Sequence, residues 1–444
     1  MIVRSCANRT VSTQEVEIAP SVARQRYYPW VVIGIAFLTV AVAFGTRNAF
    51  AVFLVAVIDE FHWSRALASG ALMLGSVIWT LSAPLIGIAL DRFGPRIVLP
   101  VGALLMAFGF VISGIAHSAV EYYIGMGALM GIGFAALTMT SQATFLSNWF
   151  VRKRGMAIGV AASGIGFGIL VVVPWTQWLI GVYGWRSALF VLAGVLALIV
   201  APANLLFQRQ RPEEMNLKPD FGQAADVPVR EIKAKSAAGP TLREALCDWR
   251  FWAFALGVLT GAIPLHMVLI HQVAAISDAG FSKESAAWAL GLIGLFTAPA
   301  MIGMGLLADR IGRPTAYAFG SAVFMVGIFF LMAVNPVTSS WLFYAFPPLI
   351  AIGFSSRQSL YPTIAADLFH GKSFGAIIGA LALFIGAGAG IGPWLGGLIF
   401  DWTGAYYWAF SIAQMMTVTS VVFIWLAGSR RPSQTFELSR SDQN

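Results

Sequence analysis

The chain alternates between long apolar segments and shorter polar ones. Each apolar segment has about 20 residues or more, enough for a helix to cross a hydrocarbon core of roughly 30 Å. Helices are the expected form because lipid offers the backbone no hydrogen-bond partners. The pattern predicts twelve such helices, at residues 30–57, 65–90, 97–116, 122–148, 156–179, 187–207, 251–275, 286–308, 315–334, 340–364, 374–400 and 406–427.

A long polar stretch divides the predicted helices into two groups of six. Residues 208–250 are charged, contain prolines and show no apolar period, which is typical of a linker. We therefore expect an N-terminal half at 30–207 and a C-terminal half at 251–427, with polar tails at 1–29 and 428–444. The first tail has no apolar core, so we do not expect a cleaved signal peptide.

The two predicted halves share short sequence patterns. The pattern Gly-x-x-x-Asp-Arg-x-Gly begins at Gly87 and again at Gly305, 218 residues later, each time between two predicted helices. Pro174-Trp175 is similarly matched by Pro393-Trp394 in the second half. Internal repeats of this kind are typical of transporters, in which two halves rock against each other around a central site.

Composition and charge agree with a membrane protein. Apolar residues make up 58% of the chain and charged residues 11%, which excludes a soluble domain. The net charge is +8, but its position does not indicate a nucleic-acid surface. If both termini are cytoplasmic, 23 of the 28 Lys and Arg residues lie in cytoplasmic segments, and Arg65, Arg186 and Lys283 lie outside. This asymmetry predicts a multi-pass protein with both termini in the cytoplasm.

Two arginines lie inside predicted helices. Arg47 is in 30–57 and Arg357 is in 340–364. An arginine at the centre of a membrane helix costs about 2.5 to 3.5 kcal/mol on insertion scales, so it normally faces a cavity and marks function. No carboxylate within the predicted helices neutralises either one, and guanidinium groups bind carboxylates in a bidentate manner. An external anion is therefore the simplest partner, although either side chain could instead extend to an interface or bond to helix carbonyls.

Several motifs resemble a known family. The repeated Gly-x-x-x-Asp-Arg-x-Gly loop resembles the signature loop of the major facilitator superfamily. Gly45-Thr46-Arg47, Asn148-Trp149-Phe150 and Gly392-Pro393-Trp394 resemble its bacterial monocarboxylate porter and oxalate:formate antiporter group. The resemblance implies an all-α membrane protein with twelve transmembrane helices in two pseudo-symmetric six-helix halves, located in a bacterial inner (plasma) membrane. This chain departs from its relatives at Met301, where an arginine is common, and Arg357 is our hypothesis for the displaced charge.

In this family, four helices line a central cavity. The resemblance implies that the corresponding helices of this chain are 30–57, 122–148, 251–275 and 340–364. The resemblance therefore implies a binding site at the polar residues of these helices. The candidate substrate-binding residues are Arg47, Asn48, Gln142, His266, Arg357 and Tyr361.

His266 is the candidate for proton coupling. It is the repeat counterpart of Asn48, and Pro264 just before it would interrupt the helix and expose backbone groups to the cavity. Histidine titrates near neutrality, and no buried carboxylate is available for the same task. The alternative is a histidine whose role is only to pack.

The two signature loops are candidate gates. In the family, the loop aspartate is held by a helix N-terminus of the opposite half, where an exposed anion is stabilised by about 0.3 to 1 kcal/mol. The alternative is that each loop is only a polar hairpin. The candidate gating residues are Asp91, Arg92, Arg96, Asp309, Arg310 and Arg313.

We therefore expect a secondary active transporter of a small organic anion, a monocarboxylate or dicarboxylate, that works by alternating access with proton symport or anion antiport. The alternatives are an efflux transporter of drugs or amphiphiles and, from another class, a transporter-like membrane sensor. No metal-ligand cluster, Gly-x-Ser-x-Gly motif or phosphate loop is present in the sequence, so we expect no enzyme, metal or cofactor. The expected partners are the anion, protons or a counter-anion and the lipid bilayer, with no nucleic acid, and we expect a monomer.

Overall fold

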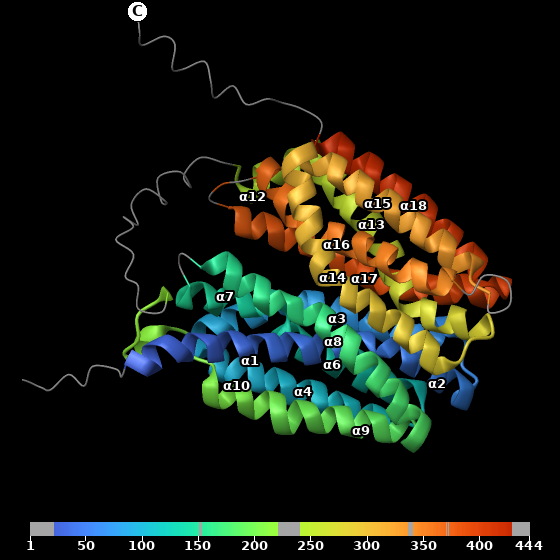
Figure 1. The fold of residues 1–444 in the computed structure, drawn as a ribbon, viewed down its shortest axis with the longest axis horizontal. Coiled ribbons are helices and arrows are strands. Elements are labelled where there is room, and N and C mark those ends of the chain that lie inside the picture. The colour runs from blue at the N-terminus through green and yellow to red at the C-terminus, as the bar shows by residue number, and fades with distance from the viewer. Residues whose placement is uncertain are drawn as a thin grey trace, which may run out of the picture.

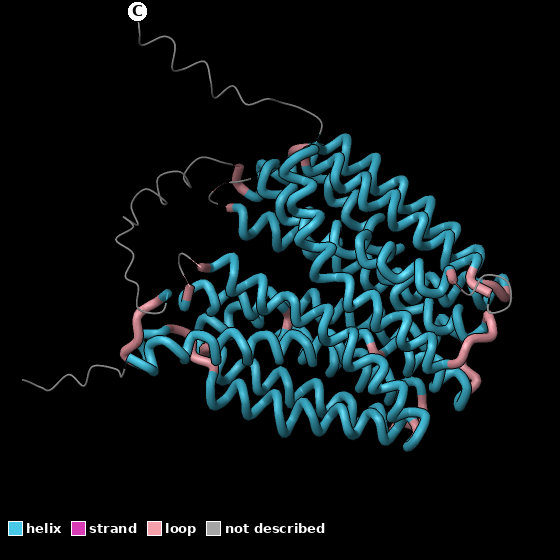
Figure 2. The backbone as a smooth tube through the Cα atoms, viewed as in Figure 1, coloured by secondary structure: helices cyan, strands magenta, loops and turns pink. Residues whose placement is uncertain are grey.

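The computed structural model describes residues 22–150, 153–220, 240–335, 341–369, 371 and 373–428. Within these ranges every regular element is a helix (Figure 2). Eleven helical segments are long and apolar enough to cross a membrane. The remaining predicted span is α16 (Leu342–Phe369), which has 28 residues and contains Arg357 and three prolines. The protein is thus an all-α membrane protein with the predicted twelve-helix architecture.

The N-terminal half begins earlier than predicted, because α1 starts at Val22 within the segment expected to be a tail. Several of its membrane segments are interrupted helices. Its elements are α1 (Val22–Asn48), α2 (Phe50–Phe61), α3 (Arg65–Phe93), α4 (Pro95–Gly114), α5 (Ala119–Tyr122), η1 (Tyr123–Leu129), α6 (Met130–Leu137), α7 (Met139–Trp149), α8 (Arg154–Tyr183), α9 (Trp185–Val195), η2 (Leu196–Val200) and α10 (Ala201–Phe207).

The C-terminal half consists of longer, continuous helices. Between the halves, the described part of the linker contains η3 (Pro212–Met215), and residues 1–21, 221–239 and 429–444 lie outside the described residues. The elements of this half are α12 (Leu242–Cys247), α13 (Trp249–Asp278), α14 (Lys283–Ile311), α15 (Arg313–Ala333), α16, α17 (Phe374–Thr403) and α18 (Tyr406–Gly428).

The repeat seen in the sequence is a repeat of local structure. α3 and α14 both have 29 residues, and each begins after a serine, Ser64 or Ser282, whose side chain accepts a hydrogen bond from a backbone N–H of the first turn at 3.1 Å. Each helix ends at the last glycine of the signature loop, where Gly94 has φ 74° and Gly312 has φ 87°. A side chain would strain these positive-φ positions, which explains why the loop requires glycine there.

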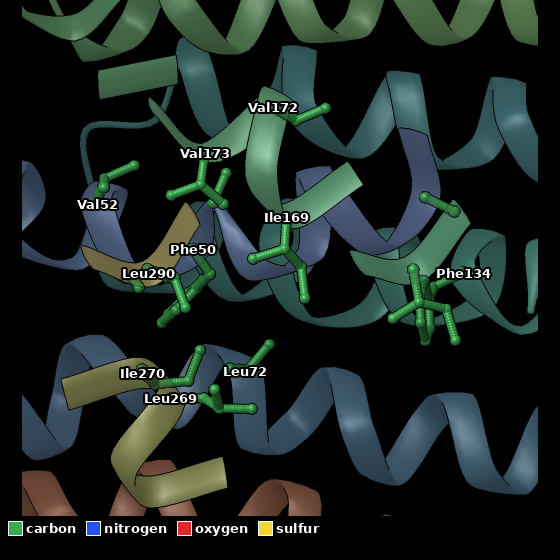
Figure 3. Close-up of a cluster of buried hydrophobic side chains, with 14 of the residues drawn as sticks. Phe50, Val52, Leu72, Phe134, Ile169, Val172, Val173, Leu269, Ile270 and Leu290 are labelled. Carbon is green, nitrogen blue, oxygen red and sulfur yellow. The ribbon is translucent and has the colours of Figure 1, made fainter. Parts of the chain in front are cut away.

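The two halves pack together along two helix pairs, α3 with α17 and α8 with α14. In Figure 1 the blue-to-green half and the yellow-to-red half form separate bundles that meet along these helices. One buried apolar cluster spans both halves, and Figure 3 shows part of it, with Leu72 of α3 beside Leu269 and Ile270 of α13. We call the end of the bundle where α2 leads into α3 the closed end.

The opposite end, where α3 leads into α4, is here called the open end. There the core of the C-terminal half forms its own cluster, which includes Phe251, Tyr361 and Ile377 and contains no residue of the N-terminal half. Glycines on the four pairing helices show the same contrast. Near the middle of α8 and α14, Gly166 and Gly294 meet so closely that a Cβ on either would lie 2.4 Å from the other's carbonyl oxygen.

At the open end, the glycines of these four helices face open space. A Cβ placed on any of them would meet no atom within 4 Å. They are Gly87 of α3, Gly155 and Gly159 of α8, Gly303 and Gly305 of α14, and Gly375 and Gly379 of α17. The halves are therefore joined at one end and separated at the other.

Candidate functional site

A cavity of about 350 Å³ lies between the halves, and its lining combines aromatic and apolar side chains with a few polar ones. Both halves contribute, through α1, α3, α6, α7 and α8 on one side and α13, α14, α16 and α17 on the other. A mostly apolar cavity with a few convergent polar groups is typical of small-molecule binding. Its polar and aromatic lining residues include Phe44, Arg47, Trp79, Phe134, Thr138, Thr140, Phe254, His266, Arg357, Gln358 and Tyr361.

Arg47 lies in the last turn of α1 and faces this cavity. A Cβ on Gly45 would be 2.7 Å from the carbonyl oxygen of Gly168, so that face of α1 packs directly on α8. Two residues further on, at about 100° per residue, the side chain of Arg47 leaves the opposite face of the helix. The packing of α1 therefore directs the guanidinium into the space between the halves.

The Arg47 guanidinium is buried, with 7% of the residue exposed, and it has few partners. Nη2 donates to Ser76 Oγ at 3.3 Å, and Cζ lies 5.2 Å from the ring centre of Phe134 and 5.6 Å from that of Trp79. Among the described residues no carboxylate pairs with it. A buried cation held only by a hydroxyl and two aromatic rings is a favourable site for an anion.

His266 lies on α13, across the cavity from α1. Its Nδ1 is 2.9 Å from the carbonyl oxygen of Ala262, and a carbonyl can only accept a hydrogen bond. Nδ1 therefore carries the proton, and Nε2 keeps a lone pair on a side chain that lines the cavity. This neutral imidazole can accept a hydrogen bond or a proton from a bound molecule.

Arg357 also lines the cavity, but most of its guanidinium is held by the protein. Nε donates to the carbonyl oxygen of Gly261 at 3.0 Å and Nη1 to that of Gly353 at 2.8 Å, while Cζ lies 4.5 Å from the ring centre of Phe324. Only Nη2 is buried without a partner. The structure thus shows the bonding to helix carbonyls that the sequence left open as an alternative, and it leaves one N–H arm of Arg357 free.

Tyr361, which lines the cavity one turn further along α16, belongs to a chain of hydroxyl groups. Its oxygen is 3.1 Å from that of Tyr317, which lies 2.6 Å from Ser420 Oγ, and Ser420 donates to the carbonyl oxygen of Gly257 at 2.5 Å. Tyr317 and Ser420 were not predicted from the sequence because α15 and α18 were not among the helices expected to line the cavity.

Asn48 and Gln142 are not among the residues that line the cavity. The Nδ2 of Asn48 donates to the carbonyl oxygen of Phe44 at 2.8 Å, within its own helix. Gln142 is fully buried on α7, and neither its Oε1 nor its Nε2 has a hydrogen-bond partner. The structure therefore brings together four of the six candidate substrate-binding residues: Arg47, His266, Arg357 and Tyr361.

The candidate gating residues lie at the open end. Asp91 and Asp309 are exposed, and neither forms a hydrogen bond or ion pair with another described residue. Arg92 and Arg310 are exposed as well. Arg96 donates from Nε to the carbonyl oxygen of Leu205 at 3.0 Å, and Arg313 pairs with Asp367, so these two arginines bond within their own halves.

At the closed end, the halves are joined by a network that was not predicted from the sequence. The carboxylate of Asp401 on α17 accepts hydrogen bonds from the backbone N–H groups of Arg65 and Ala66 on α3, both at 2.8 Å. The Arg65 guanidinium pairs with Asp278 at 2.8 Å and donates to the hydroxyl of Tyr406. In the sequence, the one indication of this network was Arg65, which is one of three basic residues predicted to lie on the outer side of the membrane.

A second ion pair crosses the halves at the same end. Lys283 Nζ lies 2.5 Å from Asp59 Oδ2, which connects α14 to α2. The ion pair between Glu60 and Arg186, in contrast, stays within the N-terminal half. Solvent-exposed pairs contribute little individually. Arg65 is half-buried, with 15% of its side chain exposed, so we expect its contacts to contribute more to holding the halves together.

Comparison with known proteins identifies relatives along nearly the whole chain. The family model described as the Major Facilitator Superfamily matches residues 36–275 and 253–442. Monocarboxylate transporter 13 of Bos taurus is 29% identical over 393 residues, which cover 86% of this chain and 85% of that protein. Monocarboxylate transporter 2 of Homo sapiens is 24% identical over 428 residues, which cover 94% and 88%.

The fold also matches a solved structure. A bacterial homolog of the human lysosomal transporter Spinster, in an inward-facing and unoccupied conformation, superposes with a TM-score of 0.65 at 16% identity. The match covers 90% of this chain and 95% of that one. At this identity the likeness concerns the fold alone.

Proposed function

Because the chain belongs to the Major Facilitator Superfamily and is a membrane transporter, not an enzyme, we propose that it is a secondary active transporter that moves a small organic anion by alternating access. The observation that carries this proposal is Arg47, a buried guanidinium that lines a cavity shared by both halves and has no carboxylate partner in the part of the chain that the structure describes. The names of the relatives favour a monocarboxylate.

A monocarboxylate suits the polar and apolar parts of the cavity. Its carboxylate would accept hydrogen bonds from Nε and Nη1 of Arg47, the two nitrogens for which no hydrogen bond to another described residue is found. Its short carbon chain would lie against Trp79 and Phe134, whose rings already pack on the guanidinium. From the opposite half, Nη2 of Arg357 and the hydroxyl of Tyr361 are the candidate further donors.

We assign the coupling step to His266. Its unprotonated Nε2 can take up a proton when an anion neutralises Arg47, because the cation that would repel an imidazolium is then paired. Proton symport follows if the proton and the anion leave together. Anion exchange follows if the loaded site can be emptied only by another anion.

The open end is proposed to face the cytoplasm, as the excess of Lys and Arg in the segments at that end indicates. In this orientation the protein is inward-facing, both termini are cytoplasmic, and residues 208–250 connect the halves from inside. The unpartnered Asp91 and Asp309 are then latches that engage only when this end closes. We propose a bacterial inner membrane as the location and a monomer as the working unit.

The test is thermal stabilisation of the purified protein by a panel of small carboxylates. A ligand at 100 times its Kd adds about 2.7 kcal/mol to the free energy of unfolding. We expect at least one carboxylate to stabilise the wild type, and Arg47→Gln to abolish that stabilisation. Arg96→Gln, which changes an arginine far from the cavity, is the matched control and should keep the stabilisation.

Two outcomes would overturn the proposal. Stabilisation by lipophilic cations and by no anion would favour the efflux of amphiphiles, for which the aromatic lining is also suited. Stabilisation by a carboxylate that survives Arg47→Gln would place the anion elsewhere. Uptake of the stabilising compound into proteoliposomes then separates transport from a sensor that only binds its ligand.

A further inference from the structure

The second buried histidine of α13, His271, lies in the network that holds the closed end together. It is 0% exposed and both of its ring nitrogens have partners. Nε2 lies 2.6 Å from the carbonyl oxygen of Pro393 on α17, and Nδ1 lies 3.0 Å from the hydroxyl of Tyr406 on α18. The hydroxyl of Tyr406 in turn accepts a hydrogen bond from Nη1 of Arg65 on α3.

The direction of each hydrogen bond in this chain is determined. The carbonyl of Pro393 can only accept, so Nε2 of His271 carries the ring proton and Nδ1 has a lone pair. Tyr406 therefore donates its O–H to Nδ1, and its oxygen lone pair is directed to Arg65. With a neutral imidazole, the hydrogen-bonding groups of Pro393, His271, Tyr406 and Arg65 are all satisfied at once.

A proton on Nδ1 would disrupt this arrangement. Nδ1 would become a donor, so the O–H of Tyr406 would lose its acceptor. The imidazolium and the guanidinium of Arg65 would then both approach the same hydroxyl oxygen, and two like charges in a buried site repel each other strongly. The guanidinium of Arg65 connects α3 of the N-terminal half to Asp278 of α13 and Tyr406 of α18, so its release would weaken the closure.

The charged groups around His271 carry both signs. The nearby charged groups are Arg65 on α3, Asp278 on α13 and Asp401 on α17, which amount to one cation and two carboxylates. Two further ion pairs lie at the closed end, one between Asp59 and Lys283 and one between Glu60 and Arg186. Within each pair the two charges neutralise each other. The other histidines at this end, His62 and His117, are exposed and belong to the N-terminal half.

A second cavity gives the network access to solvent at the closed end. It has a volume of about 430 Å³ and is lined by Arg65, Asp278, Phe400 and Tyr406, among others. Tyr406 borders this cavity and also contacts His271, so its hydroxyl lies between the solvent side and the buried imidazole. A proton can therefore reach Nδ1 through one hydroxyl group while the halves remain joined.

We propose that His271 is a proton-binding site that controls the closed end: the neutral imidazole keeps the halves joined, and the imidazolium releases Arg65 and opens this end. The ligand of the site is a proton taken from the side that the closed end faces, which is the outside in the proposed orientation. Low external pH thus favours the outward-open state, and the loss of the proton is required for closure. Only the assignment of the closed end to the outside of the membrane rests on the proposed function.

The experiment measures the opening of the closed end against pH in the absence of substrate. Spin labels are placed at Val120→Cys and Trp341→Cys, exposed positions at this end of the two halves, in a Cys6→Ser, Cys247→Ser background. Pulsed electron paramagnetic resonance gives the distance distribution from about pH 8 to about pH 5.5, the range in which histidine ordinarily titrates. We expect the ratio of open to closed protein to rise on the order of tenfold as the pH falls.

Three variants make the result specific. His271→Gln supplies a neutral acceptor and donor in the same place, so it should stay closed at every pH. His117→Gln, which changes an exposed histidine at the same end, should respond as the wild type does. Tyr406→Phe removes the shared hydroxyl, so its open fraction should be raised at high pH and should change little with pH.

A wild-type response in His271→Gln would overturn the inference. If that variant does not fold, a full wild-type pH response in Tyr406→Phe overturns it instead. Carboxylate stabilisation measured on the same samples keeps the two proposals apart. A pH response without carboxylate binding rejects the proposed substrate class only, and binding without a pH response rejects the role of His271 only.

Discussion

The carboxylate of Asp401 caps the first turn of α3, since its oxygens accept hydrogen bonds from the backbone nitrogens of Arg65 and Ala66, each at 2.8 Å. Asp401 and Arg65 are 336 residues apart in the chain and belong to opposite halves. The first N–H groups of a helix have no partner within the helix, and an anion is stabilised there. A helix terminus of one half is thus completed by a side chain of the other.

Replacement of Asp401 by alanine should therefore weaken the closed end specifically. Loss of a capping side chain costs about 0.5 to 2 kcal/mol, which corresponds to a roughly two- to thirtyfold increase in the ratio of open to closed protein. The measurement is the alkylation rate of Leu72→Cys, a buried position of the inter-half cluster, in a cysteine-free background. Asp309→Ala, which removes an unpartnered carboxylate at the open end, is the control, and equal rates in both variants would contradict the prediction.

The glycine contact between α8 and α14 should be equally sensitive. Gly166→Ala places a methyl group 2.4 Å from the carbonyl oxygen of Gly294, so α8 and α14 must move apart. Such overpacking typically costs about 1 to 3 kcal/mol. We expect faster alkylation of Leu72→Cys in Gly166→Ala.

Gly159→Ala provides the matched control on the same helix. A Cβ at Gly159 meets nothing within 4 Å, so the alkylation rate at the closed end should remain that of the wild type. If both alanines accelerate alkylation to the same extent, the effect comes from helix α8 as a whole and not from its contact with α14.

Replacement of the two cavity arginines should have different effects on the stability of the ligand-free protein. Arg357→Gln removes hydrogen bonds to two buried carbonyl groups, and bonds from a charged donor are worth about 1.5 to 3 kcal/mol. Arg47→Gln removes a buried charge that has no counter-ion, so stability should be unchanged or higher. Thermal unfolding without added anion measures both, and equal losses in the two variants would show that Arg47 is also structural.

Asp91 should matter for the rate of transport and not for the stability of this conformation. It has no partner among the described residues here, so Asp91→Asn should leave the unfolding temperature and the membrane abundance unchanged. If it is held by a helix N-terminus when the open end closes, the lost stabilisation of about 0.3 to 1 kcal/mol changes the transport rate roughly two- to fivefold. Initial uptake rates normalised to abundance test this, and failure of Asp91→Asn to insert would support a purely structural loop.

The order of the helices and the repeat were predictable because they follow from local patterns. Apolar segments define membrane helices, and the offset between the signature loops is matched by the glycines that end α3 and α14 with a positive φ. The cavity position of Arg47 was predictable for the same reason, since a charge in an apolar segment needs a polar environment. These conclusions require only neighbouring residues.

The contacts of individual side chains were less predictable because they depend on distant residues. The sequence placed Arg357 on a cavity helix, but Gly261 and Phe324, which hold its guanidinium, come from two other helices. Asn48 and Gln142 are polar residues of helices predicted to line the cavity, yet they are not among the residues that line it. The closed-end network joins Arg65 to residues more than 200 positions away, and no local pattern records that pairing.

The glycines at the open end indicate that this protein has been selected for more than the conformation seen here. In the middle of a helix, glycine is less stable than alanine by roughly 0.5 to 1 kcal/mol, and such a residue is usually retained for the close contact that it permits. Seven glycines on α3, α8, α14 and α17 permit no contact in this conformation. Their benefit must arise in a different arrangement of the same helices, one in which this end is tightly joined. A protein optimised only for the conformation seen here would have alanines at these positions, so the chain is a compromise between two structures.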